Sequence, residues 1–260
     1  MTIIYEEHNQ TYGYRRIMDE YNETHDTKYN KKRFHRLAKI AGLQAIIRRK
    51  KPAYHYHKEE QTAENILART FTAEQPNEKW LTDVTEMTYG NGQKLYLSAI
   101  MDLGAKDIVA YTIGESNNNH LVFSNLDLAI EKYPKAQPLI HSDRGFQYTS
   151  KSFKAKLDAA GMTQSMSRKG KCIDNGPMEG FWGILKCEIY HYGKKYETRE
   201  KLEVAIKEWI RYYSHERYQR RFGVRTPYEV RSEALCNENP VQYPIPENKA
   251  IQKYKAAHYA

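Results

Sequence analysis

Three acidic residues that lie far apart in the chain stand where their side chains could do chemistry together. Asp83 lies in W-L-T-D-V-T, a run of strand-like composition, Asp143 ends P-L-I-H-S-D, and Glu179 follows in a helical pattern. Three carboxylates that converge without basic partners repel one another by on the order of several kcal/mol in a partly desolvated cleft, so they require cations. Oxygen ligands of this kind suit Mg²⁺ or Mn²⁺. The pattern therefore predicts a divalent metal site formed by Asp83, Asp143 and Glu179.

A site of this composition indicates phosphoryl transfer on DNA. Two metal ions about 4 Å apart can activate a nucleophilic oxygen on one side of a phosphodiester and stabilise the leaving oxygen on the other. The predicted reaction is an in-line displacement. Each acid taken alone also has a structural explanation, because Asp143 would cap a loop and Asp174 a helix. The metal-site interpretation depends on the combination of spacing and topology.

The expected secondary structure explains how the acids could meet. Strands are predicted at 80–89, 93–102, 107–113, 138–142 and 164–167, and helices at about 118–133, 150–160, 174–190 and 198–213. Three antiparallel strands followed by alternating helices and parallel strands form a mixed five-stranded sheet with helices on both faces. If the first and fourth strands are neighbours, Asp83 and Asp143 emerge on one side, where a crossing helix offers Glu179. This α/β order matches the RNase H type of fold.

The helix that carries Glu179 has a second feature. Gly176, Glu179, Gly183 and Lys186 share one face, at i, i+3, i+7 and i+10. The two glycines leave that face low, so a DNA backbone could approach the acid while Lys186 meets a phosphate. Trp182 is among the large residues predicted to pack inward on the opposite face.

The first 51 residues show a pattern typical of a helix-turn-helix. Two short helices are predicted, the second capped by Asn30 and ended by Gly42. Residues 28–51 hold ten Lys or Arg and no Asp or Glu. On one face of the second helix three basic residues line up at i, i+4 and i+7: Lys32, Arg36 and Lys39. Such a helix addresses DNA through phosphate contacts, and the alternative is a solvated helix face.

Length and composition restrict the class of protein. The 260 residues are enough for one sizeable domain and one or two smaller ones, and the formal net charge of +9 favours a polyanionic partner. Three irregularly spaced cysteines fit neither a disulfide framework nor a zinc site. With no apolar run near about 20 residues and no signal peptide, a cytoplasmic location is expected. His55 and His57, one residue apart in a linker, are interpreted as incidental.

Four segments together resemble the catalytic signatures of bacterial transposases of the insertion-sequence three family, within the retroviral-integrase-like DDE superfamily. They are W-L-T-D-V-T, H-S-D-R-G-F-Q-Y, S-M-S-R-K-G-K-C-I-D-N and M-E-G-F-W-G-I-L-K-C-E. T-Y-G-Y-R-R-I and G-L-Q-A-I-I-R-R-K-K resemble the small helical domain that precedes the core in second-frame products of such elements. The resemblance covers about Thr11 to Val230. Where the family usually shows Ser-Arg, this chain has Ala105-Lys106.

The resemblance implies that Asp83, Asp143 and Glu179 form a catalytic triad and that Lys186 contacts element-end DNA. Two further residues, Arg168 and Lys169, would lie near bound DNA, with an exposed basic turn as the alternative. The implied reaction is cleavage at the element ends, which leaves a 3′-hydroxyl that attacks another phosphodiester. The implied partners are double-stranded DNA of the terminal repeats and target, a second copy of the chain, and a first-frame product or fusion made by frameshifting.

The expected domain division has five parts. They are a helical DNA-binding domain at 1–51, a linker at 52–77, an RNase H-like catalytic core at 78–197, a C-terminal helical region at 198–232 and a tail at 233–260. Two other functions stay open beside transposition. One is a hydrolytic RNase H-like nuclease that uses only water, and the other is a non-catalytic DNA-binding regulator of the element.

Overall fold

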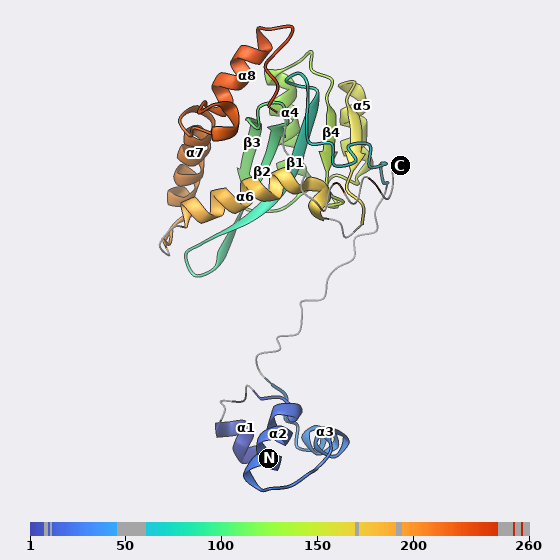
Figure 1. Ribbon diagram of the computed structural model, residues 1–260, viewed down its shortest axis with the longest axis vertical. Helices are drawn as coiled ribbons and strands as arrows, with labels where there is room; N and C mark the ends of the chain where they lie inside the picture. Colours follow the sequence, from blue (N-terminus) through green and yellow to red (C-terminus); the bar gives the residue numbers. More distant parts are fainter. Residues whose placement is uncertain are drawn as a thin grey trace. The chain divides into compact units, whose positions relative to one another are not determined.

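The computed structural model describes residues 1–7, 10, 12–45, 61–169, 172–190, 194–243, 252 and 256. The chain divides into two compact units, Met1–Tyr56 and His57–Ala260 (Figure 1). The basic run at 48–51, His55, His57 and most of the tail lie outside the described residues, and the five-part domain division stays a prediction. Within the described ranges, no helix is both long enough and apolar enough to cross a membrane.

The N-terminal unit consists of short helices. They are α1 Thr2–Glu7, α2 Tyr14–Thr24 and α3 Lys31–Ile40. Ile17 of α2 is fully buried and packs with Phe34 of α3 in a small apolar cluster. The Asn30 side chain accepts a hydrogen bond from the Arg33 amide at 3.0 Å, which caps α3 as predicted. The sequence pattern does not predict α1, because six residues are too few to show a helical period.

A five-stranded sheet forms the centre of the larger unit, in the order β3-β2-β1-β4-β5. The strands are β1 Lys79–Tyr89, β2 Gln93–Asp102, β3 Ile108–Gly114, β4 Leu139–Ser142 and β5 Thr163–Met166. The central strand β1 pairs antiparallel with β2 and parallel with β4. This mixed sheet confirms the predicted α/β class, and the strand ends fall within about one residue of the predicted ones.

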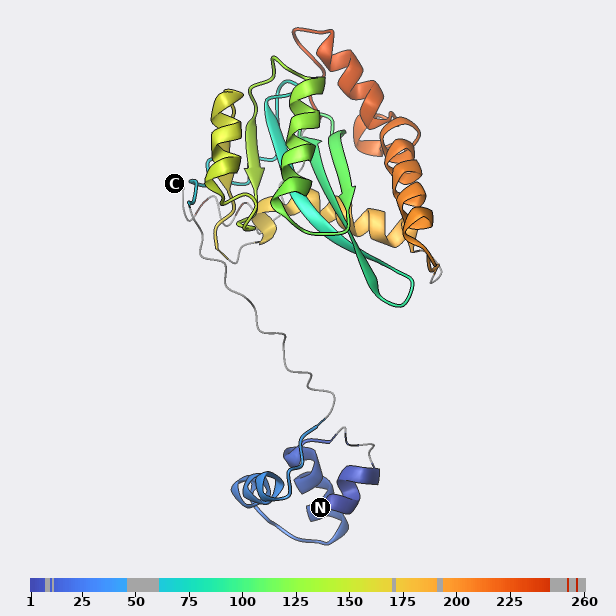
Figure 2. The ribbon, with the colours of Figure 1, turned by 180° about the vertical axis from the view of Figure 1, so that it is seen from behind.

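Helices cover both faces of the sheet (Figures 1 and 2). The helices α4 Asn119–Lys132 and α5 Lys151–Ala159 pack on one face, and α6 Gly176–Ile189 and α7 Arg199–His215 pack on the other. Alternate residues of β1 divide between the two cores. Trp80 belongs to the α4–α5 side, whereas Leu81 and Met87 belong to the α6–α7 side. The side chains of β1 are therefore committed to one face or the other.

A buried ion pair attaches the C-terminal helix α8 Pro227–Leu235 to the sheet. The Arg231 guanidinium lies 2.8 Å from the carboxylate of Asp102, the last residue of β2, and both side chains are almost fully buried. Thr226 and Glu229 form a capping box at the start of α8. This helix begins inside the C-terminal region 198–232 that the sequence predicts to be helical and ends at Leu235, three residues beyond it.

Candidate active site

Asp83 lies on the face of β1 that α6 covers. Side chains alternate along a strand, and Leu81 and Met87, at even spacing from Asp83, both belong to the core under α6. Two donors hold the Asp83 carboxylate. The indole Nε1 of Trp182 on α6 donates to Oδ2 at 3.0 Å, and the Val84 amide donates to Oδ1 at 2.8 Å. The strand and the helix therefore meet at this carboxylate.

Asp143 stands beside Asp83 because of the register between β1 and β4. Leu81 is level with His141 in this parallel pair, and each acid follows two residues further along. Asp143 comes directly after β4, and its side chain is exposed on one side. Its Oδ1 accepts a hydrogen bond from the Gly145 amide at 2.8 Å. The residue therefore does cap a loop, but this cap uses one of its two carboxylate oxygens.

The pKa of Asp83 reflects both burial and the proximity of the other acids. The pKa of Asp83 is raised to about 7, first by burial and then by the charge of Asp143, with a further contribution from Glu179. Burial raises the pKa of Asp143 as well. Burial raises the pKa of Tyr148 far above its ordinary value, and the charges of both aspartates add to this. The site therefore carries excess negative charge.

Glu179 approaches the same region from α6. It lies in the first turn of the helix, where the helix dipole favours a carboxylate, and its side chain is exposed. Trp182 follows three residues later, so one helix carries Glu179 and also donates to Asp83. Trp182 is buried, as predicted, but the sequence pattern did not reveal its bond to Asp83. The one sequence signal for this bond is the E-G-F-W segment, which places Trp182 three residues after Glu179 on the same helix.

The donor set suits a divalent metal by its chemistry but not by its spacing. Clustered carboxylates, here Asp143 and Glu179 whose charges raise the pKa of Asp83, are ligands of the kind that Mg²⁺ and Mn²⁺ favour. Among the residues that the structure describes, no three His, Cys, Asp or Glu side chains lie close enough together to hold one ion. Asp83 is fixed by two donors, whereas the exposed Glu179 keeps its rotamer freedom.

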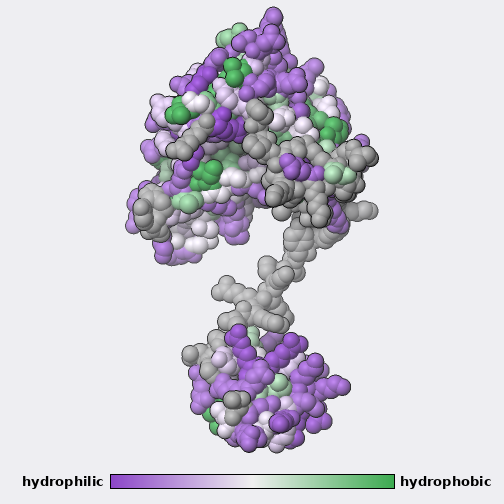
Figure 3. Space-filling model, in the orientation of Figure 1, coloured by the Kyte–Doolittle hydropathy of each residue, from purple (hydrophilic) through white to green (hydrophobic). Residues whose placement is uncertain are grey.

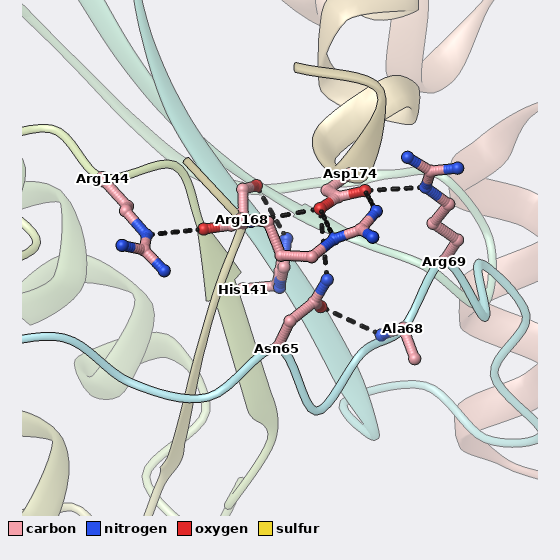
Figure 4. Close-up of polar contacts among 8 residues, drawn as sticks. Asn65, Ala68, Arg69, His141, Arg144, Arg168 and Asp174 are labelled. Atoms are coloured by element: carbon pink, nitrogen blue, oxygen red, sulfur yellow. Dashed lines mark hydrogen bonds and ion pairs between the residues drawn. The ribbon is translucent and has the colours of Figure 1, made fainter. Parts of the chain in front are cut away.

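A buried ion network fixes the turn that precedes α6 (Figure 4). Asp174, fully buried in the turn Cys172–Asn175, lies 2.6 Å from Arg69 Nε and 2.8 Å from Arg168 Nη2. Asn65 Nδ2 donates to the same carboxylate at 3.2 Å. Burial alone would raise the pKa of Asp174, but hydrogen bonds from Arg168 and Arg69 outweigh it and lower the pKa to about 2. The residue therefore joins three segments and is not a simple helix cap.

Arg168 is engaged within the protein through this network. Both its guanidinium and its backbone amide donate to Asp174 (Figure 4). The neighbouring Lys169 has an exposed side chain. In the same region Arg144, next to Asp143, donates from Nε to the Ser167 carbonyl at 2.9 Å. A DNA contact by Arg168 or Lys169 stays a prediction.

The other predicted DNA contacts lie on two helices. Lys186 is half-buried on α6, two turns after Glu179. On α3, opposite the buried Phe34 and Ala38, three side chains are exposed: Lys32, Arg36 and Lys39. The helix α3 belongs to the N-terminal unit, Met1–Tyr56.

Comparison with known proteins identifies the family. An HTH-like domain model matches residues 1–51, an integrase core domain model matches 73–172, and a second integrase core model matches 179–244. An uncharacterized transposase-like protein of Haemophilus influenzae is 41% identical over 80% of this chain and 95% of its own length. The putative transposase InsK of IS150 from Escherichia coli is 38% identical over 88% of this chain and 81% of its own. The InsF transposase of IS3A from the same species is 31% identical over 77% of this chain and 69% of its own length.

The chain belongs to the insertion-sequence three family of transposases. This confirms the resemblance seen in the sequence motifs. A transposase of this family combines an HTH-like DNA-binding domain with an integrase core, and it acts in DNA transposition. One solved chain, from the simian T-cell lymphotropic virus intasome, is 17% identical, with a TM-score of 0.54 over 85% of this chain and 73% of its own. That likeness concerns the fold, and it confirms the RNase H-like architecture expected for this transposase.

Proposed function

We propose that this transposase cuts DNA at the ends of its element and joins the freed 3′-hydroxyl to target DNA, with Asp83, Asp143 and Glu179 as the catalytic residues. The electrostatic coupling of acids from β1, the end of β4 and α6 carries the proposal. If the carboxylates served only as ion-pair partners, basic groups would lower their pKa values, but both aspartate values are raised. Such excess negative charge suits a cation site for phosphate chemistry.

The same three residues would hold Mg²⁺ or Mn²⁺, two ions in the complete site. When bound, the ions would activate the attacking oxygen and offset the charge that develops on the leaving oxygen. Asp83 is already oriented by Trp182 and Val84. The exposed Glu179 is the side chain that can turn to complete the ligand set.

Basic groups of the chain would bind and orient the DNA. Lys186, on the same helix as Glu179, would contact a phosphate of the element end, and Arg168 and Lys169 would border the DNA path. Three exposed cations of α3 would hold the HTH-like domain on the terminal repeat through backbone contacts: Lys32, Arg36 and Lys39. These contacts position the DNA and supply little sequence discrimination.

The active assembly would contain at least two copies of the chain on paired element ends. The structural neighbour with a TM-score of 0.54 is part of an intasome, which supports this proposal by analogy of fold. A first-frame product or a frameshifted fusion would be a further partner. The molar mass of the complex on end DNA, measured by light scattering, tests the assembly.

The decisive experiment compares Glu179→Gln with Glu200→Gln. Both residues lie in the first turn of a helix, α6 and α7 respectively, so both substitutions remove the same kind of helix-dipole interaction. Labelled end duplexes are incubated with purified protein and Mg²⁺ or Mn²⁺. Glu179→Gln is expected to lose cleavage and joining by a factor on the order of 10³ or more, because it removes a metal ligand, whereas Glu200→Gln stays active.

The products separate transposition from its alternatives. Joined strands support the proposal, whereas cleaved ends without joined product would indicate a hydrolytic nuclease. Equal activity of wild type and Glu179→Gln would end the catalytic assignment of Glu179, and no product from wild type with either metal would leave a DNA-binding regulator.

A further inference from the structure

A cavity lies against the flank of α6 that carries Gly180 and Ile184. It has a volume of about 370 Å³. Its lining includes Phe71, Met101, Lys106, Phe181, Tyr213 and Arg221. Cavities of roughly 300–1,000 Å³ are the size at which proteins bind small molecules. None of the proposed catalytic residues contributes to this lining.

Two glycines leave part of the α6 backbone open beside this cavity. Gly176, Gly180 and Ile184 follow one another at i, i+4 and i+8 and all line the cavity. A Cβ atom added to either glycine would meet nothing within 4 Å. In Figure 3 a small hydrophobic patch is visible beside α6 on a face that is otherwise mostly hydrophilic. A ligand could therefore lie directly on the helix.

The cavity wall contains a buried amine that has no acceptor. Lys106 is 5% exposed, and within the described part of the chain its ammonium group has no hydrogen-bond partner. Arg221 adds a second positive charge close enough to help burial lower the pKa of Lys106 to about 7. Asp102, whose charge raises the pKa of Lys106, is already paired with Arg231. A buried amine without an acceptor is costly.

We propose that this cavity binds a small organic anion, a carboxylate carried on an apolar or aromatic body. The carboxylate would accept hydrogen bonds from Lys106 and Gln219 and lie near Arg221. The body would pack on the rings of Phe71 and Phe181 and on the glycines of α6. This combination explains both the unpaired amine of Lys106 and the apolar lining, and it does not depend on the proposed catalytic role of the triad.

The binding test uses the full-length protein and simple probes. Benzoate and phenylacetate are compared with benzyl alcohol, benzylamine and inorganic phosphate by thermal unfolding and by isothermal titration calorimetry. The two carboxylates are expected to bind saturably and to raise Tm, and the other probes are not. A response to phosphate equal to that of benzoate, an equal response to benzyl alcohol, or no response to either carboxylate would overturn the proposal.

Lys106→Met provides a paired test, because methionine keeps the apolar length and removes the amine. Without ligand this variant is expected to unfold at a higher temperature than wild type, since the substitution removes an unpaired buried group. Its affinity for benzoate is expected to fall by about tenfold or more. Lys132→Met is the control, because its ammonium donates to the Val109 carbonyl at 3.2 Å. The control should lower Tm and leave benzoate affinity unchanged.

Gly180→Leu tests the same cavity without changing any charge. The leucine would occupy the open space over the helix and should favour the helix itself. Loss of benzoate binding in a variant that stays folded is the expected result. Unchanged binding in Gly180→Leu would place the ligand elsewhere and overturn the proposal, even if Lys106→Met failed to fold.

Discussion

The hydrogen bond from Trp182 to Asp83 connects the two elements that carry the first and third acids. It orients the Asp83 carboxylate and opposes the rise in the pKa of that group. Glu179 lies one turn before Trp182, so any shift of α6 would change the Trp182–Asp83 bond and the position of Glu179 together. Trp182 is therefore a positioning residue for the proposed metal site.

Trp182→Phe should separate this role from packing. Phenylalanine fills most of the indole volume but donates no hydrogen bond, so strand-joining activity is expected to fall about tenfold, with a higher Mg²⁺ requirement. Trp209→Phe is the matched control, because its Nε1 donates to Glu188 Oε2 at 2.9 Å. Equal losses in both variants, with an unchanged Mg²⁺ requirement, would show that Trp182 acts through packing alone.

Asp83 is expected to give the metal-free protein a characteristic pH dependence. Its pKa rises from 3.8 to about 7 on folding, so the folded state holds the proton more tightly than the unfolded chain. The resulting stabilisation is present below about pH 4 and is lost as the pH rises to about 7. His141, whose pKa burial lowers to about 4, has the opposite slope in part of this range, so the variant must be compared with wild type at each pH.

Asp83→Asn removes this titration and keeps the shape of the side chain. In urea unfolding with EDTA, the variant should gain stability relative to wild type between pH 4.5 and pH 7.5. Adding Mg²⁺ at pH 7.5 should then stabilise wild type but not the variant. A stability difference that stays constant with pH would contradict the raised pKa of Asp83.

The segment that enters the larger unit lies along the sheet edge and ends at the turn before α6. The Met166 amide donates to the Glu64 carbonyl at 3.2 Å, and the Leu67 amide donates to Ser165 Oγ at 3.0 Å. Asn65 and Arg69 then contact Asp174 (Figure 4). The start of α6, and with it Glu179, is thereby attached to β5 and to the incoming chain.

Asp174→Asn should destabilise the fold, because it leaves Arg69 and Arg168 without their anion. The expected loss in the free energy of unfolding is about 3–5 kcal/mol at pH 7. The pKa of Asp174 is lowered to about 2, so its stabilisation should disappear as the pH falls from about 4 to about 2. Asp158→Asn, in an exposed pair with Lys154, is the control and should change stability by about 0.5 kcal/mol or less. Equally small effects of Asp174→Asn and Asp158→Asn would show that the Asp174 network does not stabilise the fold at the start of α6.

In the proposed function, the N-terminal unit holds the terminal repeat and the larger unit carries the acid site. The net charge of +9 and the exposed cations of α3 suit a polyanion, whereas the acids at β1 and β4 are concentrated in the other unit. Neutralising α3 should therefore weaken DNA binding without changing the acid site.

The combined substitution of Lys32, Arg36 and Lys39 by Gln tests this division. Binding to end duplexes should weaken, and the slope of log Kd against log salt should fall by about 0.9 for each phosphate that the protein no longer neutralises. A triple Gln variant at Lys94, Lys201 and Lys207 has the same net charge and uses exposed lysines outside α3. Equal weakening in both variants would assign binding to overall charge.

Local chemistry explains why much of this protein was predictable. The alternation in β1, the Asn30 cap and the apolar runs of the sheet are short-range patterns, so the strands and most helices could be predicted from the chain. The motif spacing likewise identified Asp83, Asp143 and Glu179 as candidates. Their catalytic role stays a proposal.

Contacts between distant segments decided the rest. The bond from Trp182 to Asp83, the capture of Arg168 by Asp174 and the orphan donor of Lys106 join residues or surfaces with no periodic relation in the chain. An isolated arginine in a basic turn resembles a DNA contact, and only packing shows that its charge has a buried partner. Sequence therefore determined which groups the protein has and which elements carry them, whereas the tertiary structure determined which groups share a low-dielectric environment, where pairing governs charge.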